Sequence, residues 1–562
     1  MKKNFVKSRW LFTMLLFVTT MIMPSMMLAQ SITPTTPKGK GTAEEPYQIS
    51  TAAELYWFAG LVNGTLPDGG GKDASANAIL TDNITVNEGV LDAVNKGQVS
   101  ESDFIEWKPI GTYDSYDAVY TGTFDGQGHT ISGLYFNHPD ASYVGLFGYI
   151  RANGKISNVG VSDSYFKFRM KGGGVCGKND KDGVLQNCSN SSTVIGKNQN
   201  SRTGGVCGDN SGTVRDCKNT GSVSGENFVG GVCGINLGTI KSCYNTGSVH
   251  GTDIYVGGVC GNSYRVTNTN YCYYLSDTAT RGIGNLMADE KDKAEKMFKE
   301  QFESGEMAWL LNGKGSGEQV WGQHLGIDES PVPGSAYKVI KAAQGDNDTY
   351  WATFSNLTND ATLSVPSDRK LYVYNATVSG GKMTLTQRND YQVAKEEGVL
   401  LKTDGEYVNA KANETNDLTK ASSDVNHLVA TPAEAKTVTA ETGYILYRLT
   451  YNDATNKKGL GFYLGVDEDN NSSDGTRLKA IPGKAYLKVS ENAAKAPSSA
   501  ALTRSFVFGG GSETTGIDGI TIMGTDVQRH GTIEGIFDLQ GRKISNPTKG
   551  IYIKNNKKVI IK

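Results

Sequence analysis

The sequence predicts an all-β protein whose first part is a β-solenoid with three short strands per coil. Three observations support this fold class. The pentapeptide Gly-Gly-Val-Cys-Gly occurs four times, starting at residues 173, 204, 230 and 257. Each copy is followed by a second cysteine, and equivalent cysteines recur 26 to 31 residues apart, a period typical of stacked supersecondary units. Glycine supplies 69 of the 562 residues, which suits many closely spaced turns.

Within one repeat, short β-prone runs alternate with turn residues. The runs Val232-Cys233, Thr239–Cys243 and Ser248-Val249 are separated by Asn236–Gly238 and Asn245–Gly247. Because Gly and Asn accept the positive φ of tight corners, we expect each run to be one strand and each Asn-x-Gly one corner. Successive coils would then pair strand on strand, about 4.8 Å apart, with equivalent residues in register.

Both ends of the solenoid are expected to carry helical caps. Residues 50–62 predict an amphipathic helix with Ser50 or Thr51 as its N-cap. Its apolar face comprises Leu55, Phe58, Ala59 and Val62. Such a helix would cover the open strands of the first coil, which otherwise invite edge pairing. At the other end, residues 291–311 predict one or two helices broken near Ser304-Gly305.

Changes in composition along the chain predict six segments. They are a signal peptide at 1–29, a linker at 30–42, the capped solenoid at 43–335, a β-sandwich-like domain at 336–508, a linker at 509–516 and a small β domain at 517–562. The basic start, the apolar stretch at 10–23 and the small-residue end are typical of a secretory signal peptide cut after Ala29. No later stretch approaches the roughly twenty apolar residues of a membrane-spanning helix, so we expect an exported chain without a transmembrane segment.

Charge and histidine spacing exclude several function classes. The net charge is only −2, from 56 basic and 58 acidic residues, which does not favour nucleic acid as a partner. The six histidines are His129, His138, His250, His324, His427 and His530. None has a second histidine four residues away, so the zinc-peptidase motif His-Glu-x-x-His is absent. We therefore expect no catalytic residue, no cofactor and no metal site.

All eight cysteines fall in the repeat region, and two arrangements fit them. Export permits one disulfide per repeat, which would give the pairs Cys176–Cys188, Cys207–Cys217, Cys233–Cys243 and Cys260–Cys272. Alternatively, the eight form two ladders of reduced thiols, because cysteine behaves as a small buried hydrophobe. We predict the ladders and keep the bridges as the alternative. Zinc is not expected, because no closely spaced Cys pair is present.

Three loops carry residues that could support chemistry. Asp125 and His129 could act as acid and base of a β-helix carbohydrate enzyme, but they also fit a tight structural corner. Ser211 has Leu237 as its repeat equivalent, which indicates a turn position. The acidic loop 467–475 lacks the spacing of an EF-hand, which favours a solvated hairpin loop.

Aromatic residues near the coil corners are the candidate contact residues of the solenoid. They are Tyr143, Tyr165, Phe166, Phe228, Tyr255 and Tyr273. If they point outward, their rings could stack on sugars or partner chains; if inward, they fill the interior. The repeat carboxylates Asp209, Asp216 and Glu226 are scattered, whereas glycosidic chemistry needs two in one groove.

The repeats resemble the GLUG repeat, known from bacterial surface proteins and from immunoglobulin A peptidases that carry it beside their catalytic domain. The resemblance rests on Gly-Gly-Val-Cys-Gly followed by Gly-Thr-Ile and Cys-Tyr-Asn-Thr-Gly-Ser-Val, and covers about residues 41–335. The segments 537–542 and 549–553 are similar to the sorting domain of type IX secretion in Bacteroidetes. That resemblance implies passage across the outer membrane, with secretion machinery as a partner. It implies Asp538, Gly541, Arg542, Gly550 and Tyr552 as sorting residues.

Together these features predict a non-enzymatic, exported protein at the cell surface, in the outer membrane or outside the cell. Its solenoid would be an adhesive or binding platform for glycans or proteins of a host or a neighbouring cell, because solenoids present long regular faces. Two alternatives stay open. One is a carbohydrate-active β-helix enzyme, and the other is a purely structural surface-layer component.

Overall fold

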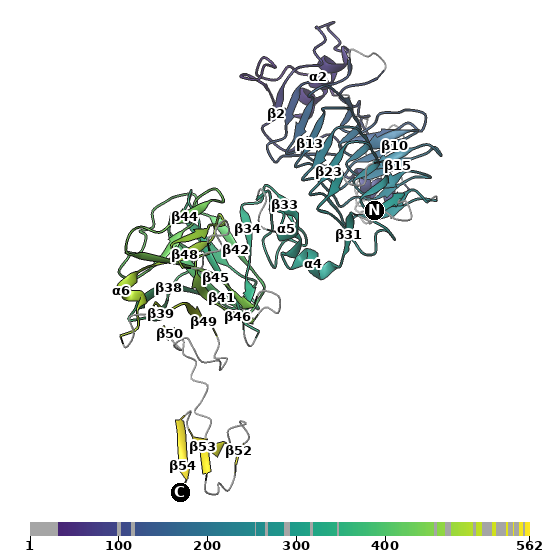
Figure 1. Cartoon of the computed structure of the whole chain (residues 1–562). Helices are drawn as coiled ribbons and strands as arrows, with labels where there is room; N and C mark the ends of the chain where they lie inside the picture. The colour runs from purple at the N-terminus through teal and green to yellow at the C-terminus, as the bar shows by residue number, and fades with distance from the viewer. Residues whose placement is uncertain are drawn as a thin grey trace, which may run out of the picture. The chain divides into compact units, whose positions relative to one another are not determined.

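The computed structural model describes most of the chain beyond residue 31 (Figure 1). The described ranges are 32–97, 103–113, 118–252, 254–264, 268–285, 293–314, 319–345, 348–453, 458–466, 474–497 and 502–508, with the strand residues 520–523, 536–537, 543–544, 550–554 and 557–561. The predicted signal peptide and the 509–516 linker lie outside these residues. The chain divides into two compact units between Val339 and Ile340, and each unit is described by itself.

The first unit is a β-solenoid built from five parallel sheets, which we name A to E. Sheet A contains β1 (Tyr47–Ile49), β2 (Ala78–Leu80), β4 (Thr123–Asp125), β8 (Lys155–Ser157), β13 (Val184–Gln186), β18 (Thr213–Arg215), β23 (Thr239–Lys241) and β28 (Thr269–Asn270). Sheet B contains β3 (Ile84–Thr85), β5 (Thr130–Ser132), β9 (Gly160–Ser162), β14 (Ser189–Asn190), β19 (Lys218–Asn219), β24 (Tyr244–Asn245), β29 (Cys272–Leu275) and β31 (Ala294–Met297).

The other three sheets of the solenoid are shorter. Sheet C contains β6 (Tyr135–Asn137), β10 (Tyr165–Phe168), β15 (Thr193–Gly196), β20 (Val223–Ser224) and β25 (Val249–His250). Sheet D contains β7 (Phe147–Ile150), β12 (Cys176–Asn179), β17 (Cys207–Asn210), β22 (Cys233–Asn236), β27 (Cys260–Ser263) and β30 (Ile283–Asn285). Sheet E contains β11 (Lys171–Gly173), β16 (Arg202–Gly204), β21 (Val229–Gly230) and β26 (Val256–Gly257). A coil runs through the sheets in the order E, D, A, B, C.

The predicted solenoid is confirmed, but a complete coil contains five short strands and not three. The run Thr239–Cys243 bends at Ser242, whose φ is +51°, so only Thr239–Lys241 belongs to sheet A, and a separate strand of sheet B starts at Tyr244. The fifth strand is the short one that ends at the first glycine of each motif, such as Val229–Gly230. Each A–B corner of the central coils has one non-glycine residue with φ between 51° and 56°: Asn158, Asn187, Asp216, Ser242 and Tyr271.

The repeat glycines are required for close approach and not, as predicted, for a positive φ. No described glycine between residues 134 and 304 has a positive φ. A Cβ on Gly230 would lie 1.9 Å from the carbonyl oxygen of Cys233, and one on Gly234 would lie 2.5 Å from the backbone nitrogen of Thr203. Sheets D and E therefore pack backbone against backbone, and only glycine leaves enough space between them.

The middle glycine of the motif makes room for a ladder of buried asparagines. A Cβ on Gly231 would lie 2.3 Å from Cγ of Asn245 and 2.1 Å from the carbonyl oxygen of Gly258. The Nδ2 atom of Asn190 donates to Oδ1 of Asn219 at 2.7 Å, and Asn219 donates to Asn245 at 2.7 Å. Each asparagine donates a hydrogen bond to the asparagine of the next coil, so these amides keep partners although they are buried.

A second asparagine ladder closes the corner between sheets D and A. Asn179 donates through Nδ2 to Oδ1 of Asn210 at 2.8 Å, and Asn210 donates to Asn236 at 2.7 Å. All three side chains are fully buried. The two ladders fix the register of the coils, because a shift by one residue would leave several buried amides without partners.

The N-terminal cap has the predicted form. Helix α2 (Ala52–Asn63) starts at the N-cap Thr51, whose Oγ1 accepts from the Glu54 N–H while the Glu54 carboxylate accepts from the Thr51 N–H. The predicted apolar face of Leu55, Phe58, Ala59 and Val62 is buried. The Phe58 ring lies 6.0 Å from the ring of Phe124 in sheet A, so the helix covers the open end of the core. A short helix, α3 (Val90–Asn95), packs on Tyr135 of sheet C.

The C-terminal cap differs from the prediction at one place. Helices α4 (Lys299–Glu303) and α5 (Glu306–Leu311) are separated at Ser304-Gly305, as expected. Residues 294–297, within the range predicted as helical, form β31 and extend sheet B. Ala294 and Met297 at the ends of this strand are buried, whereas Glu295 and Lys296 are exposed.

The C-terminal cap covers the outer face of sheet B as well as its end. The Tyr244 ring lies 5.5 Å from the ring of Phe302 and 5.3 Å from that of Trp321. Its hydroxyl donates to the carbonyl oxygen of Pro331 at 2.6 Å. Trp321 begins β32 (Trp321–Gly322), which pairs with β33 (Val332–Pro333). Among the described residues, no helix is long and apolar enough to cross a membrane.

The second unit is built almost entirely from antiparallel strands. Sheet F contains β34 (Tyr337–Lys341), β42 (Tyr407–Ala412), β37 (Ala361–Ser364) and β40 (Gln392–Val393). Sheet G contains β35 (Ala343–Gln344), β36 (Tyr350–Ser355), β41 (Gly398–Thr403), β38 (Leu371–Ser379), β39 (Lys382–Gln387) and β50 (Ile520–Met523). Sheet H contains β43 (Leu428–Ala430), β48 (Ala485–Ser490), β45 (Tyr444–Asp453), β46 (Lys458–Leu464) and β49 (Ser505–Val507), and α6 (Glu491–Ala494) follows β48.

Sheet G is the central layer of this unit. Along β41, Val399 and Leu401 belong to a core shared with sheet F, whereas Leu400 belongs to a core shared with sheet H. This alternation follows from the two-residue period of a strand. β44 (Thr437–Thr439) and β47 (Arg477–Lys479) pair in a small antiparallel sheet, and along the chain both fall between strands of sheet H. The last four strands, β51 (Ile536–Phe537), β52 (Lys543–Ile544), β53 (Gly550–Lys554) and β54 (Lys557–Ile561), form a separate antiparallel sheet.

Replacing Gly231 by alanine should destabilise the solenoid by at least about 2 kcal/mol, because the added methyl group meets backbone on one side and Asn245 on the other. Gly71→Ala is the matched control, since a Cβ at Gly71 has nothing within 4 Å and should change stability by less than about 0.5 kcal/mol. Urea unfolding followed by circular dichroism measures both. Equal stability of the two variants would contradict the close approach of the coils.

Candidate functional site

The eight cysteines lie in two ladders inside the solenoid. Cys176, Cys207, Cys233 and Cys260 pair in register along sheet D, with Phe147 before them and Ile283 after them. Cys188, Cys217, Cys243 and Cys272 form the second row, in which the Cys188 N–H lies 3.4 Å from Sγ of Cys217. All eight are buried as free thiols. Equivalent cysteines of neighbouring coils are thus the ones that stack.

For six of these thiols the surroundings disfavour the thiolate form, whereas hydrogen bonds from Cys176 and Cys233 lower the pKa of Cys207 between them. Burial raises the pKa of the Cys176 and Cys233 thiols well above the ordinary value, and raises that of Cys260 to about 12. In the second row, burial likewise raises the pKa of Cys188 and Cys243. Since the thiolate is the reactive form, the ladders are structural elements of the core.

Among the predicted sorting residues, Gly550 and Tyr552 lie in β53. Asp538, Gly541 and Arg542 lie outside the described residues. Most of the acidic loop 467–475 also lies outside them, since the description resumes at Asp474.

The loops that could have supported chemistry have structural partners. Oδ1 of Asp125 accepts from the Gln127 N–H at 3.0 Å and from Nδ2 of Asn158 at 2.8 Å, as a corner residue does. The Ser211 and Leu237 N–H groups both bind the carbonyl oxygen of an asparagine in the preceding coil, so the two residues occupy one turn position. Within the described ranges, no three His, Cys, Asp or Glu side chains are grouped to hold a metal ion.

The repeat carboxylates occupy three different positions of the coil. Asp209 lies in sheet D, Asp216 lies at the A–B corner beside Arg215, and Glu226 lies between sheets C and E. A glycosidase needs two carboxyl groups that face each other across one groove. The structure does not bring any two of these three residues together in that way.

The six corner aromatics divide into two groups. Phe166 is fully buried, Tyr273 is 3% exposed and Tyr165 is 9% exposed, so these three belong to the packed structure. Tyr143, Phe228 and Tyr255 are half-buried. Only this second group offers ring faces to a partner.

The second group lies in one row at the start of sheet E. Val144 pairs with Gly172, and the following strands of sheet E continue this register from coil to coil. The residues directly before these paired positions are Tyr143, Lys171, Arg202, Phe228 and Tyr255, which we name the aromatic-cationic strip. Neighbouring members are one coil apart, so the strip extends over about 19 Å.

The first part of the strip is a stack of tyrosines covered by lysines. The rings of Tyr143 and Tyr149 are parallel within 6°, with centroids 5.5 Å apart, and the Tyr113 ring lies 5.2 Å from Tyr143. Nζ of Lys171 lies 5.0 Å from the centroid of Tyr143, and Nζ of Lys178 lies 4.8 Å from that of Tyr149. Both distances suit cation–π attraction, which orients the lysines over the rings.

A hydrogen bond anchors this stack at its base. The Tyr149 hydroxyl donates to Oδ2 of Asp180 at 2.7 Å. Burial raises the pKa of Tyr149, and the bond to Asp180 raises it further, so the phenol stays protonated. Burial alone would raise the pKa of Asp180, but the Tyr149 hydroxyl and the charges of Lys178 and Arg151 outweigh it and lower that pKa.

The middle of the strip is an ion-pair network around one buried carboxylate. The Asp209 side chain is 3% exposed and lies between the two cations of the neighbouring strip positions. Nζ of Lys171 lies 3.2 Å from its Oδ2, and Arg202 bonds the same oxygen. Removing either cation would leave Asp209 less well compensated, so the network holds both in place.

The last part of the strip is a second aromatic pair. The Phe228 and Tyr255 rings are stacked, with centroids 4.8 Å apart and planes 24° from parallel. The strip thus has aromatic rings at both ends and positively charged side chains between them. The sequence indicated the aromatics, but not the cations, because their alignment depends on the register of sheet E.

No protein-family model matches the chain. A stretch of 170 residues is 31% identical to halomucin of Haloquadratum walsbyi and covers 30% of this chain and 2% of halomucin. A stretch of 127 residues is 32% identical to a "Putative Gly-rich membrane protein" of Evansella cellulosilytica and covers 23% of this chain and 12% of that protein. The chain therefore spans only a small part of either relative. Among solved structures, the crystal structure of a "putative immunoglobulin A1 protease" from Bacteroides ovatus is similar, with 19% identity and a TM-score of 0.39, over 52% of this chain and 94% of that chain.

The folded protein should react with a thiol reagent at least roughly a hundredfold more slowly than the denatured protein, because all eight thiols are buried away from the reagent and six of them have a raised pKa. Thiol counting in denaturant without reductant should then recover all eight cysteines. Recovery of no free thiol would instead support the four bridges within the repeats.

Proposed function

We propose that the solenoid is the binding part of a cell-surface protein and that the aromatic-cationic strip is its contact face. The observation that carries this proposal is the alignment of Tyr143, Lys171, Arg202, Phe228 and Tyr255 in one row on a rigid scaffold. Ring faces suit the flat apolar faces of sugars, and the cations between them suit hydroxyl or carboxylate groups.

The rigidity of the strip supports binding of an extended ligand. The strands of sheet E begin at Lys171 and Arg202 and directly after Phe228 and Tyr255, and they contact sheet D through glycine, so the positions of these residues are fixed before the ligand arrives. A preorganised surface loses little conformational entropy on binding. We infer that the preferred ligand is an extended glycan of a host or neighbouring cell, with a surface protein as the second candidate.

The location at the cell surface is also our proposal. The names of the two partial relatives, halomucin and a Gly-rich membrane protein, support it. The resemblance to GLUG repeats and to a type IX sorting domain supports export through that secretion machinery. In this proposal the second unit acts as a spacer and the sheet of β51 to β54 belongs to the sorting domain.

The double change of Phe228 and Tyr255 to alanine should weaken glycan binding at least fivefold, corresponding to about 1 kcal/mol of lost aromatic contact. Glycan and protein arrays identify the ligand, and titration then measures the affinity of each variant. Tyr264→Ala is the matched control, because Tyr264 is 64% exposed and lies outside the strip. Binding that survives the double change but is lost in the control would place the contact face elsewhere.

The same screen tests the proposal that the protein is not an enzyme. Turnover of a polysaccharide or protein substrate, abolished by Asp125→Asn without loss of folding, would make the corner at Asp125 an active site. Binding without turnover is the expected result.

Removal of residues 524–562 should prevent surface display in a host with type IX secretion while both units stay folded. This deletion keeps β50, which pairs with β39 in sheet G, whereas a cut at 517 would remove an edge strand of that sheet. Immunolabelling of intact cells measures display, and protease resistance of the retained protein checks folding. Unchanged labelling of intact cells would contradict the sorting role.

A further inference from the structure

The second unit has an open hollow where the chain passes from sheet F to sheet G. It lies between the end of β37 and the start of β38, with Tyr391 from the segment before β40 at its rim. Its volume is about 520 Å³, within the usual range of small-ligand sites. The lining residues are Leu363, Ser364, Val365, Pro366, Ser367, Arg369, Lys370, Leu371, Tyr372 and Tyr391.

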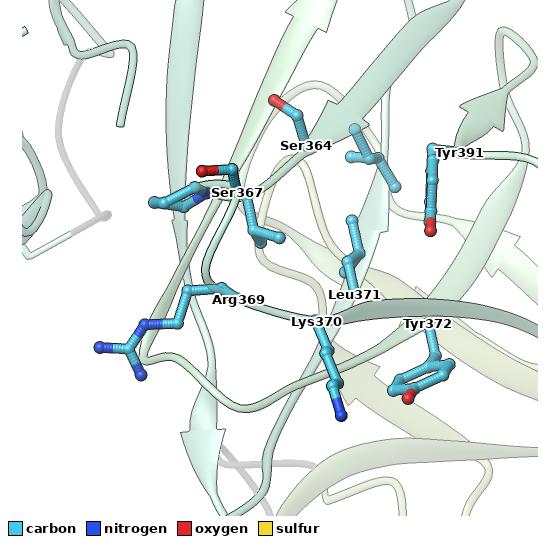
Figure 2. Close-up of a pocket in the computed structure, with 10 residues that line it drawn as sticks. Ser364, Ser367, Arg369, Lys370, Leu371, Tyr372 and Tyr391 are labelled. Carbon is cyan, nitrogen blue, oxygen red and sulfur yellow. The ribbon is translucent and has the colours of Figure 1, made fainter. Parts of the chain in front are cut away.

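The charged side chains of this lining are all positive. It contains two cations and no carboxylate. Within the described chain, the Lys370 ammonium forms no ion pair, whereas Arg369 donates to the backbone oxygen of Asp404 at 3.1 Å and lies 3.9 Å from the Asp368 carboxylate. Figure 2 shows Lys370, Tyr372 and Tyr391 around Leu371, with the Arg369 guanidinium pointing away from them. Lys370 is therefore the cation available to a ligand in the hollow.

The remaining lining combines a ring face with hydroxyl groups. Tyr391 is 52% exposed, so its ring is accessible to a ligand in the hollow. Its backbone is held in place, because its carbonyl oxygen accepts from the Leu363 N–H at 2.9 Å. Ser364 and Ser367 line the hollow on the side away from Tyr391 (Figure 2). Leu363 and Leu371 supply the apolar floor.

We propose that this hollow binds a carboxylated sugar, whose carboxylate pairs with Lys370 and whose ring stacks on Tyr391. Charge selects an anion, the exposed ring selects a ligand with a flat apolar face, and the tyrosine hydroxyls match sugar hydroxyls. A simple inorganic anion would use the cation but not the ring or the apolar floor. This site lies on the second unit and does not depend on the aromatic-cationic strip.

Saturation-transfer NMR and calorimetric titration of the full chain test the proposal. The probes are glucuronic acid and N-acetylneuraminic acid, with glucose and inorganic phosphate as the neutral and the anionic comparison. We expect binding of an acidic sugar that weakens with added salt, at least tenfold weaker binding in Lys370→Met, and a comparable loss in Tyr391→Ala. Lys382→Met, a change of an exposed lysine in β39, is the matched control and should bind as the unchanged protein does.

Three results would overturn the proposal. Equal binding of glucose would remove the role of charge, and equal binding of phosphate would reduce the hollow to a general anion site. Unchanged binding of the acidic sugars in Lys370→Met would place their site elsewhere. None of these results bears on the strip, whose variants change other residues in the first unit.

Discussion

The contact of backbone against backbone at Gly-Gly-Val-Cys-Gly is the constraint on which the solenoid depends. Sheets D and E approach so closely that a Cβ on Gly204 would lie 2.0 Å from the Cys207 carbonyl oxygen. No side chain separates the two sheets, so the chain must turn back on itself at a fixed point of every coil. That fixed point also determines which residue stands at the start of sheet E, with its side chain on the outside of the coil. The same glycines that close the core therefore align the residues of the strip.

Buried polar ladders complete this arrangement by selecting one register. A core of valine and cysteine alone would tolerate sliding of one coil over the next, since small hydrophobic residues pack in many ways. The stacked amides of Asn190, Asn219 and Asn245 do not tolerate it, because each needs the next as its partner. The ladders thus contribute specificity, whereas the hydrophobic rows between them contribute most of the burial.

The repeat period and the amphipathic face of α2 were sufficient to predict the solenoid and its first cap, because stacking in register follows from the repeat itself. The number of strands per coil was wrong, since the A–B corner accepts Asn, Asp, Ser or Tyr and so carries no constant sequence signal. The helix expected at 294–297 was wrong because pairing with β29 overrides local preference. The sequence could not show which of the six aromatics are buried, because a shift of one residue along a strand moves a side chain to the other face of the sheet. The hollow at Lys370 and Tyr391 brings together residues from separate loops, which no local pattern indicates.

The separation between scaffold and contact residues has a consequence for specificity. Each strip position lies at the start of sheet E, where its backbone takes part in the glycine contact but its side chain belongs to neither asparagine ladder. The five positions already hold Tyr, Lys, Arg, Phe and Tyr, so the coil accepts aromatic and cationic residues there with the same backbone. A change of ligand therefore requires changes in the strip alone. The exception is Asp209, which is buried beneath two cations and couples the strip to sheet D, so the charge at Lys171 and Arg202 is the part of the strip that is least free to change.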